Sequence, residues 1–191
     1  MSFMLLGILN AQAAGGSAPS AIEQIAYFEA VEGQTDNIVF NNIPQTYKHL
    51  FVVAVSHSTD AVSSVPEWLL EMNGGGNSGF HGWQAAPNFG VQNQPYYNQP
   101  LYIGDYPNDS KPAQQMGNLI LKSMNYTYSS KYPNTVTETF SPNSPSASDR
   151  VQKTVNFMMQ NTGPLTSLEF SDYRNQNLRS NTRYVLYGVL G

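Results

Sequence analysis

Short segments rich in β-branched and aromatic residues, each ended by Gly, Pro or Asn, recur along this chain of 191 residues. The 12 Tyr, 9 Phe and 2 Trp favour strands, and the 15 Gly and 12 Pro supply the breaks between them. No pattern typical of a long helix interrupts the series. The sequence therefore predicts an all-β protein in which eight to ten strands form one β-sandwich or jelly-roll-like domain. The expected strands are residues 25–31, 37–40, 47–56, 67–72, 101–103, 118–128, 135–140, 151–159, 165–170 and 183–190.

Two of these segments have informative patterns. Residues 47–56 (YKHLFVVAVS) are apolar on both faces in their second half, which predicts a strand at the centre of a sheet. Residues 151–160 alternate instead, with Val155 and Phe157 on one face and polar side chains on the other. Lys153 is the exception on the apolar face. We expect this segment to be a half-buried strand.

The chain begins with a markedly apolar segment. No Lys or Arg occurs before Lys48, which argues against a secretory signal, and the apolar run stops at Asn10, which is too short for a membrane span of about 20 residues. We expect residues 1–15 to form an extended arm that packs against another subunit; the alternative is that they close the chain's own core. The side chains expected to contact the partner are Phe3, Met4, Leu5, Leu6, Ile8 and Leu9.

The chain therefore divides into two parts. Residues 1–20 form the arm and a Gly/Ser/Pro hinge, because residues 15–20 (GGSAPS) have the composition of a flexible linker. Residues 21–191 form the β-sandwich domain, which includes a long loop at 84–116 rich in Tyr, Asn, Gln and Pro.

Composition excludes several classes of function. The net charge of −4 provides no basic surface for a phosphate backbone, so we expect no nucleic-acid binding. The absence of cysteine excludes disulfides, thiolate metal sites and cysteine nucleophiles. Only 12% of the residues are charged, which suits a protein that packs among copies of itself or its neighbours. We therefore expect a homo-oligomer, a trimer in the simplest case.

The pattern of titratable residues predicts no catalytic, cofactor-binding or metal-binding residues. On an extended strand His49 and His57 would stand about 26 Å apart, too far to bind one metal ion. Glu67 and Glu71 would be roughly 13 Å apart, beyond the separation of glycosidase carboxylate pairs. No phosphate-binding loop, dinucleotide fingerprint, zinc-protease motif or nucleophile elbow is present.

The 84–116 segment allows three interpretations. Its tyrosines would suit a subunit interface, where Tyr is enriched. They would also suit stacking on the sugar rings of a host glycan, and with Asp105 and Asp109 even glycan cleavage. The first interpretation is favoured. The tyrosines proposed for glycan or subunit contact are Tyr96, Tyr97, Tyr102 and Tyr106.

Several stretches carry a resemblance. Residues 1–16 contain LLGIL, residues 38–50 (IVFNNIPQTYKHL) contain Ile-Pro-x-x-Tyr-Lys-His-Leu, and residues 180–188 (SNTRYVLYG) end in Leu-Tyr-Gly. Together they resemble a family of tailed-bacteriophage virion proteins common in cyanophages and other marine phages. Residues 125–132 (NYTYSSKY) are similar to a further stretch of that family, with Asn where Asp is usual. Residues 72–76 (MNGGG) depart from the family's Phe-Asn-Gly-Asp, which weakens the case for a ligand at that turn.

The resemblance implies a non-enzymatic structural protein located in the virion. It would be exposed on the particle as capsid decoration, as a short fibre or as a tail adaptor, with other capsid or tail proteins as partners. The resemblance implies no catalytic residues and no cofactors. A carbohydrate-binding, receptor-recognition module of a tail fibre is the alternative.

Overall fold

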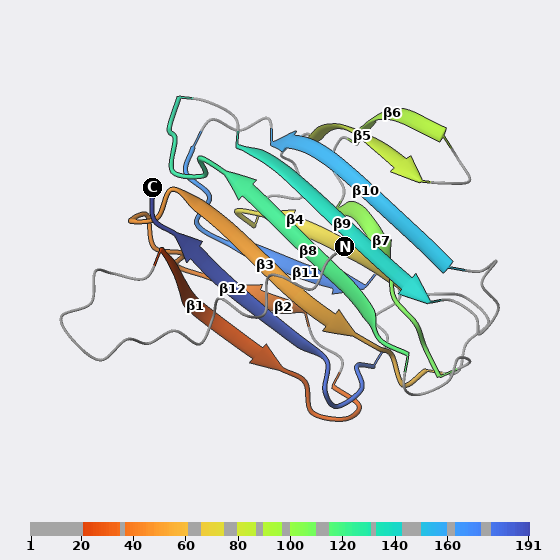
Figure 1. The fold of residues 1–191 in the computed structure, drawn as a ribbon. Helices are drawn as coiled ribbons and strands as arrows, with labels where there is room; N and C mark the ends of the chain where they lie inside the picture. Colours follow the sequence, from red (N-terminus) through yellow and green to blue (C-terminus); the bar gives the residue numbers. More distant parts are fainter. Residues whose placement is uncertain are drawn as a thin grey trace.

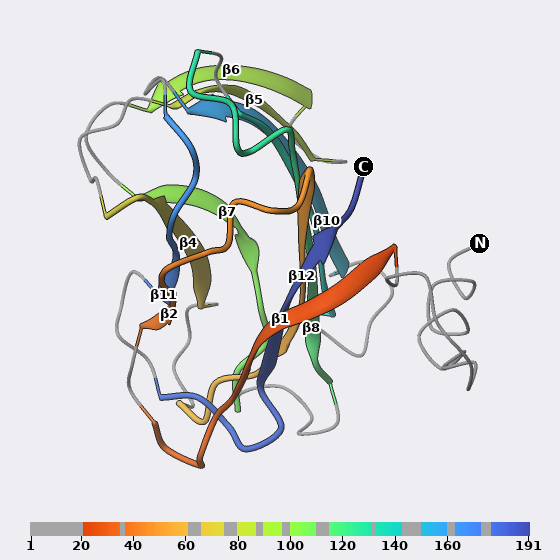
Figure 2. The same cartoon turned by 90° about the vertical axis from the view of Figure 1, so that its left-hand side faces the viewer.

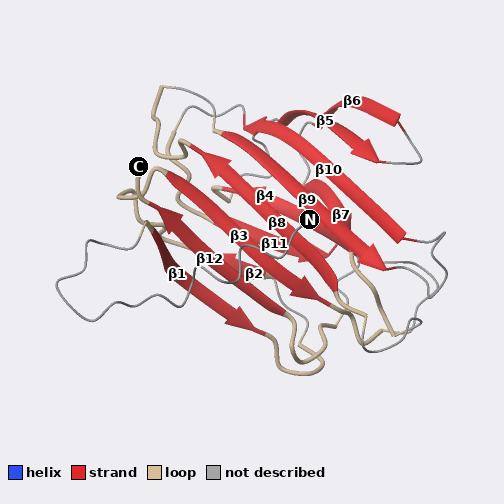
Figure 3. Cartoon of the chain, viewed as in Figure 1, coloured by secondary structure: helices blue, strands red, loops and turns tan. Residues whose placement is uncertain are grey.

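A computed structural model describes residues 21–34, 37–60, 66–74, 80–86, 90–96, 100–109, 115–130, 133–142, 150–159, 163–172 and 177–191. Within these ranges the chain forms strands, turns and loops and no helix (Figures 1 and 3). The predicted all-β sandwich is thereby confirmed, while the arm lies outside the described residues. The strands are β1 (Ile22–Glu29), β2 (Ile38–Phe40), β3 (His49–Ser56), β4 (Glu67–Met72), β5 (Phe80–Ala86), β6 (Gly90–Tyr96), β7 (Leu101–Asp105), β8 (Gly117–Met124), β9 (Asn134–Pro142), β10 (Arg150–Met159), β11 (Leu168–Asp172) and β12 (Arg183–Val189).

The strands form two antiparallel sheets of unequal width. The large sheet has the order β1-β12-β3-β8-β9-β10-β5-β6, and the small sheet has the order β2-β11-β4-β7. Figure 2 shows the small sheet lying on one side of the large sheet, so the large sheet has an inner face toward the core and an outer face. Strand β3 pairs with β12 and β8, which confirms the central position predicted for residues 47–56.

Alternation along the strands produces the core between the sheets. In β3 the inward side chains Leu50, Val52 and Ala54 are buried, whereas the intervening side chains are only half-buried. Such alternation is expected of a sheet with one face in the core, because successive side chains point to opposite faces. Fully burying a large apolar side chain stabilises the fold by about 1.5–3 kcal/mol, so this face holds the sandwich together.

Aromatic side chains fill the centre of the sandwich. The rings of Trp68 and Tyr106 have centroids 5.1 Å apart, and those of Phe170 and Tyr184 are 5.3 Å apart. The Trp68 indole N–H donates to the Tyr184 hydroxyl at 2.6 Å, and the Tyr106 hydroxyl donates to Asp172 at 3.2 Å. The buried polar atoms of these rings are therefore satisfied, as a core requires.

The segment 84–116 differs from the predicted long loop. It contains the end of β5, the whole of β6 and β7, and β5 and β6 form an antiparallel hairpin added to the edge strand β10. Gln, Asn and Pro have low strand propensity, but pairing with an existing edge overrides a weak local preference. The hairpin extends the large sheet beyond the small one (Figures 1 and 2).

Several strand boundaries also differ from those predicted, and two of the differences have a visible cause. Strand β8 ends at Met124 because Asn125 has a φ of 54° and begins a turn closed by the Tyr128 N–H and the Asn125 carbonyl. Strand β1 begins earlier than predicted, at Ile22, with an irregularity between Gln24 and Ala26. The residues before Ile25 lie outside the apolar run from which the strand was predicted, and the irregularity interrupts their alternation.

Candidate functional site on the outer face of the large sheet

The outer face of the large sheet has exposed or half-buried apolar side chains on six neighbouring strands. Cross-strand register places Tyr27, Val185 and Val53 in one row, which continues into Ile120 of β8. No described strand lies over this face, because the small sheet is on the opposite side (Figure 2). The apolar side chains of this surface, called the outer face below, are Tyr27, Phe51, Val53, Val55, Ile120, Met124, Val136, Phe140, Met158, Val185, Tyr187 and Val189.

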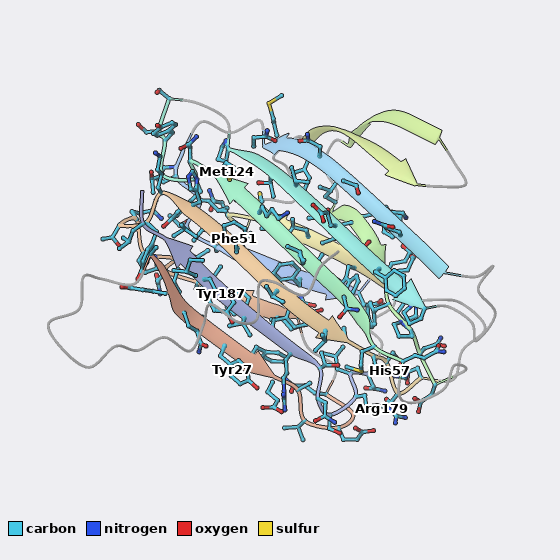
Figure 4. The ribbon with its side chains drawn as sticks, in the orientation of Figure 1. Tyr27, Phe51, His57, Met124, Arg179 and Tyr187 are labelled. Carbon is cyan, nitrogen blue, oxygen red and sulfur yellow. The ribbon has the colours of Figure 1, made fainter. Side chains whose placement is uncertain are left out.

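Several of these side chains are well exposed. Tyr27 is 48% exposed, Met158 46% and Met124 42%, and all three lie on different strands. Figure 4 shows Tyr27, Tyr187, Phe51 and Met124 following one another across β1, β12, β3 and β8. The exposure is therefore a continuous feature of the face rather than a set of scattered side chains.

The outer face can be compared in size with the apolar patches of other proteins. Six strands about 4.8 Å apart, with about seven residues of 3.3 Å each, give a sheet area on the order of 650 Å². Polar side chains occupy about half of the outward positions, so the apolar part of this area is roughly 300 Å². The largest apolar patch on a typical monomer is about 300–600 Å² and is often functional.

Charged side chains on this face are paired with one another. Lys122 Nζ lies 3.1 Å from Glu138 Oε1, and Arg183 Nη2 lies 2.8 Å from Glu29 Oε1. The Tyr27 hydroxyl donates to Glu29 at 2.5 Å, and this bond together with those from Arg183 lowers the pKa of the Glu29 carboxyl. A molecule that covers the face would therefore not have to supply a compensating charge for these four groups.

A second cluster lies at the end of β3, around His57. The His57 side chain is fully buried, and its Nδ1 is 3.6 Å from Asp109 Oδ1, too far for a hydrogen bond. Asp109 accepts a hydrogen bond from the guanidinium of Arg179. The backbone N–H of Arg179 donates to the His57 carbonyl at 2.9 Å. Figure 4 shows His57 and Arg179 near each other at this end.

The contacts of this cluster indicate a role in joining loops. Burial lowers the pKa of the His57 imidazole and keeps it neutral. Thr182 both accepts from the His57 backbone N–H and donates to its carbonyl, while Glu32 accepts from the Ser180 N–H at 2.6 Å. These bonds fasten the loops that follow β1, β3 and β11. Among the described residues, no group of three or more His, Asp or Glu is arranged to hold a metal ion.

The four tyrosines proposed for glycan or subunit contact do not share one environment. Tyr106 is 2% exposed in the core, so its ring is closed to a glycan. Tyr102 is half-buried, donates to Asp105, and lies under the buried ammonium of Lys153, which is 3.6 Å from the ring centroid. Strand β6 contains Tyr96, whose side chain is outside the description, as is the whole of Tyr97.

The environment of Lys153 explains why a lysine can occupy the apolar face of β10. It faces inward on β10, as the alternation of Val155 and Phe157 requires, and is only 5% exposed. Burial lowers the pKa of its ammonium, while the carboxylates of Asp105 and Glu67 act in the opposite direction. The interaction with the Tyr102 ring offsets part of the desolvation cost.

The motif residues quoted above meet at one end of the sandwich. The Tyr47 ring packs directly against Gly188, and its hydroxyl donates to Glu23 at 2.6 Å. The Tyr126 hydroxyl donates to the Pro44 carbonyl. These contacts join three motif segments, Ile-Pro-x-x-Tyr, Leu-Tyr-Gly and Asn-Tyr-Thr-Tyr, into one packed unit. Packing within the fold is a sufficient physical reason for the residues found in these motifs.

The described residues form a β-sandwich whose large sheet has one partly apolar face that no described strand covers. No protein-family model, curated protein or solved structure matches the chain. Within the described part of the chain, no helix is long and apolar enough to span a membrane.

The predicted arm residues Phe3, Met4, Leu5, Leu6, Ile8 and Leu9 lie outside the described residues. The outer face itself was not predicted, because apolar runs on both sides of a strand are typical of strands buried on both faces. Its signal was nevertheless present in residues 51–55 (FVVAV) and 184–189 (YVLYGV), where apolar side chains occupy both alternating positions.

Proposed function

We propose that this chain is a non-enzymatic structural protein of a bacteriophage virion, exposed on the particle as capsid decoration or as a short fibre or tail adaptor. It docks through its N-terminal arm and assembles as a homo-oligomer, for which we propose a homotrimer. The observation that supports this proposal best is the broad apolar outer face with its internally paired charges, which suits coverage by protein.

Two further features agree with a structural role. In the His57 cluster the Arg179 and Asp109 side chains bond to each other and the His57 backbone bonds to Thr182, while Tyr106 and Asp172 bond to each other in the core. The motif segments that resemble phage virion proteins form one packed unit at the end of the sandwich. These features support the proposal together with the sequence resemblance.

Particle composition tests the proposed function. Quantitative mass spectrometry of gradient-purified particles of the encoding phage should find the chain in a fixed copy number relative to the major capsid protein. Particles made without the chain should recover that number when incubated with the purified protein. Absence from the particles would overturn the proposal.

A glycan array distinguishes the receptor-recognition alternative. Specific glycan binding that is lost in Tyr96→Ala and Tyr97→Ala, and retained in Tyr128→Ala, would favour a carbohydrate-binding module. Tyr128 is a matched control because it is an exposed tyrosine in the turn after β8. Turnover of host polysaccharide that is lost in Asp105→Asn would show an enzyme and exclude the structural proposal.

A further inference from the structure

The start of β1 places the N-terminal segment beside the outer face. Ile22 pairs with Val189 at a corner of the large sheet, and the Leu190 N–H donates to the Ala21 carbonyl at 3.0 Å. Twenty residues precede Ala21, and seven of the first nine have large apolar side chains. An apolar segment therefore enters the fold at the margin of an apolar surface.

The distance between the segment and the face is compatible with contact. Gly- and Ser-rich linkers of about 12 residues, the number from 10 to 21, have a root-mean-square span of roughly 19 Å. Neighbouring strands are about 4.8 Å apart, so this span equals about four strand spacings. Residues 3–9 can therefore reach either the chain's own outer face or that of a copy packed beside it.

The width of the face decides between these occupants. Seven extended residues are about 23 Å long and about one strand spacing wide, which covers roughly 110 Å², whereas the outer face extends over six strands from β1 to β10. The chain's own arm would thus leave most of the face in water. Covering the remainder requires the body of another molecule.

Charge indicates that this molecule can be a second copy. The arm has no charged side chain, and the pairs Lys122–Glu138 and Arg183–Glu29 are already satisfied within the face. Apolar contact between copies therefore leaves none of these charges buried without a partner. An oppositely charged partner would find no net charge in these two pairs to recognise.

We propose that the outer face of the large sheet binds a second copy of this chain, which contributes its residues 3–9 to the interface. The proposal rests on the docking role given to the arm above. The arm of one copy and the face of the next can close reciprocally in a dimer, or head to tail in a ring when the rotation between copies permits. A three-membered ring satisfies this condition with every arm and every face used.

Oligomeric state tests the face. Sedimentation velocity of the full chain should show a trimer, and the double variant Tyr27→Lys with Met124→Lys should raise the dissociation constant by at least about 100-fold, as expected for charges placed in an apolar interface. Val31→Lys with Val39→Lys is the matched control, since these side chains are exposed and apolar but outside the outer face. Near-ultraviolet circular dichroism should show that both variants fold.

A label-mixing experiment identifies the owner of the arm. A photo-crosslinking phenylalanine at position 6 in equal amounts of light and heavy protein should give cross-links to peptides of β3, β8 and β12, about half of them joining light to heavy chains. Cross-links only within one label class would show that each arm covers its own face. That result, a monomer at 100 μM (about 2 mg/ml for a 21.1 kDa chain), or an oligomer unchanged by the double variant would overturn the inference.

Incorporation into particles separates this inference from the proposed function. Chains with Tyr27→Lys and Met124→Lys that still bind particles at the normal copy number would refute the face contact alone. Trimers that depend on the face, in a protein absent from particles, would refute the virion role alone.

Discussion

The aromatic ring of Tyr47 lies against the Cα of Gly188, so closely that a Cβ at position 188 would overlap the ring. Gly188→Ala should therefore displace Tyr47 and lower the free energy of unfolding by about 1–3 kcal/mol. Gly163→Ala is the control, because no other atom lies within 4 Å of a Cβ built there. Urea unfolding should separate the two variants; equal midpoints would contradict the close packing of Tyr47.

The hydrogen bond between Trp68 and Tyr184 should contribute measurably to stability. Tyr184→Phe leaves the buried Trp68 N–H without this acceptor, which should cost about 1–3 kcal/mol. Tyr47→Phe removes a hydroxyl bonded to Glu23 at a half-buried position and should cost less. Thermal unfolding should show a larger loss of stability for Tyr184→Phe than for Tyr47→Phe. An equal or smaller loss for Tyr184→Phe would show that the Trp68–Tyr184 bond contributes nothing.

Acidification should destabilise the protein through His57. Burial lowers the pKa of its imidazole in the folded state, so the unfolded chain binds the proton at the higher pH. This contribution to stability is complete above the unfolded value of about 6.5, and is lost as the pH falls below it, by at most about 1.4 kcal/mol per pH unit.

The variant His57→Gln should flatten the pH dependence of the unfolding free energy between pH 5 and 7. Nearby Asp109 and Glu32 favour the protonated form, and Arg179 opposes it, but burial has the largest effect. His49→Gln should flatten the curve less, since His49 is only half-buried. An unchanged slope in His57→Gln would exclude His57 as the origin.

Asn73 should be intolerant of replacement because its side chain fastens two segments. With a φ of 57°, it accepts hydrogen bonds from the N–H groups of Thr166 and Ser167 and donates to the Pro164 carbonyl at 3.0 Å. Asn73→Asp retains the acceptors and should cost about 1 kcal/mol, while Asn73→Ala loses every side-chain bond and should cost about 2–3 kcal/mol. Equal losses on chemical unfolding would show that the side-chain bonds do not matter.

The sequence allowed the fold class and the central strand to be predicted because both depend on local alternation. The apolar composition of residues 49–56 predicted a central strand, and the alternation in residues 151–160 showed Lys153 as the exception on the apolar face. The hairpin of β5 and β6 could not be predicted, since its residues form strands only when the edge of β10 is available for pairing.

Predicting the outer face would have required knowing which strands belong to the large sheet and which to the small sheet. Phe51, Val53 and Val55 are residue types that are usually buried. Only the position of the small sheet shows that they lie on the opposite face of the large sheet. The different environments of Tyr102, which is half-buried, and Tyr106, which is buried in the core, could not be predicted for a similar reason. Both are in or next to β7, but the Trp68 ring and Asp172 that hold Tyr106 come from other strands.

The position of β12 has a consequence for synthesis. This strand, the last of the described chain, lies between β1 and β3, which leave the ribosome long before it. Until residues 183–189 emerge, both earlier strands lack their shared neighbour and expose unpaired edges, a condition that favours aggregation. The large sheet can therefore close only after translation has passed β12, and nascent chains stalled earlier should depend on chaperones to stay soluble.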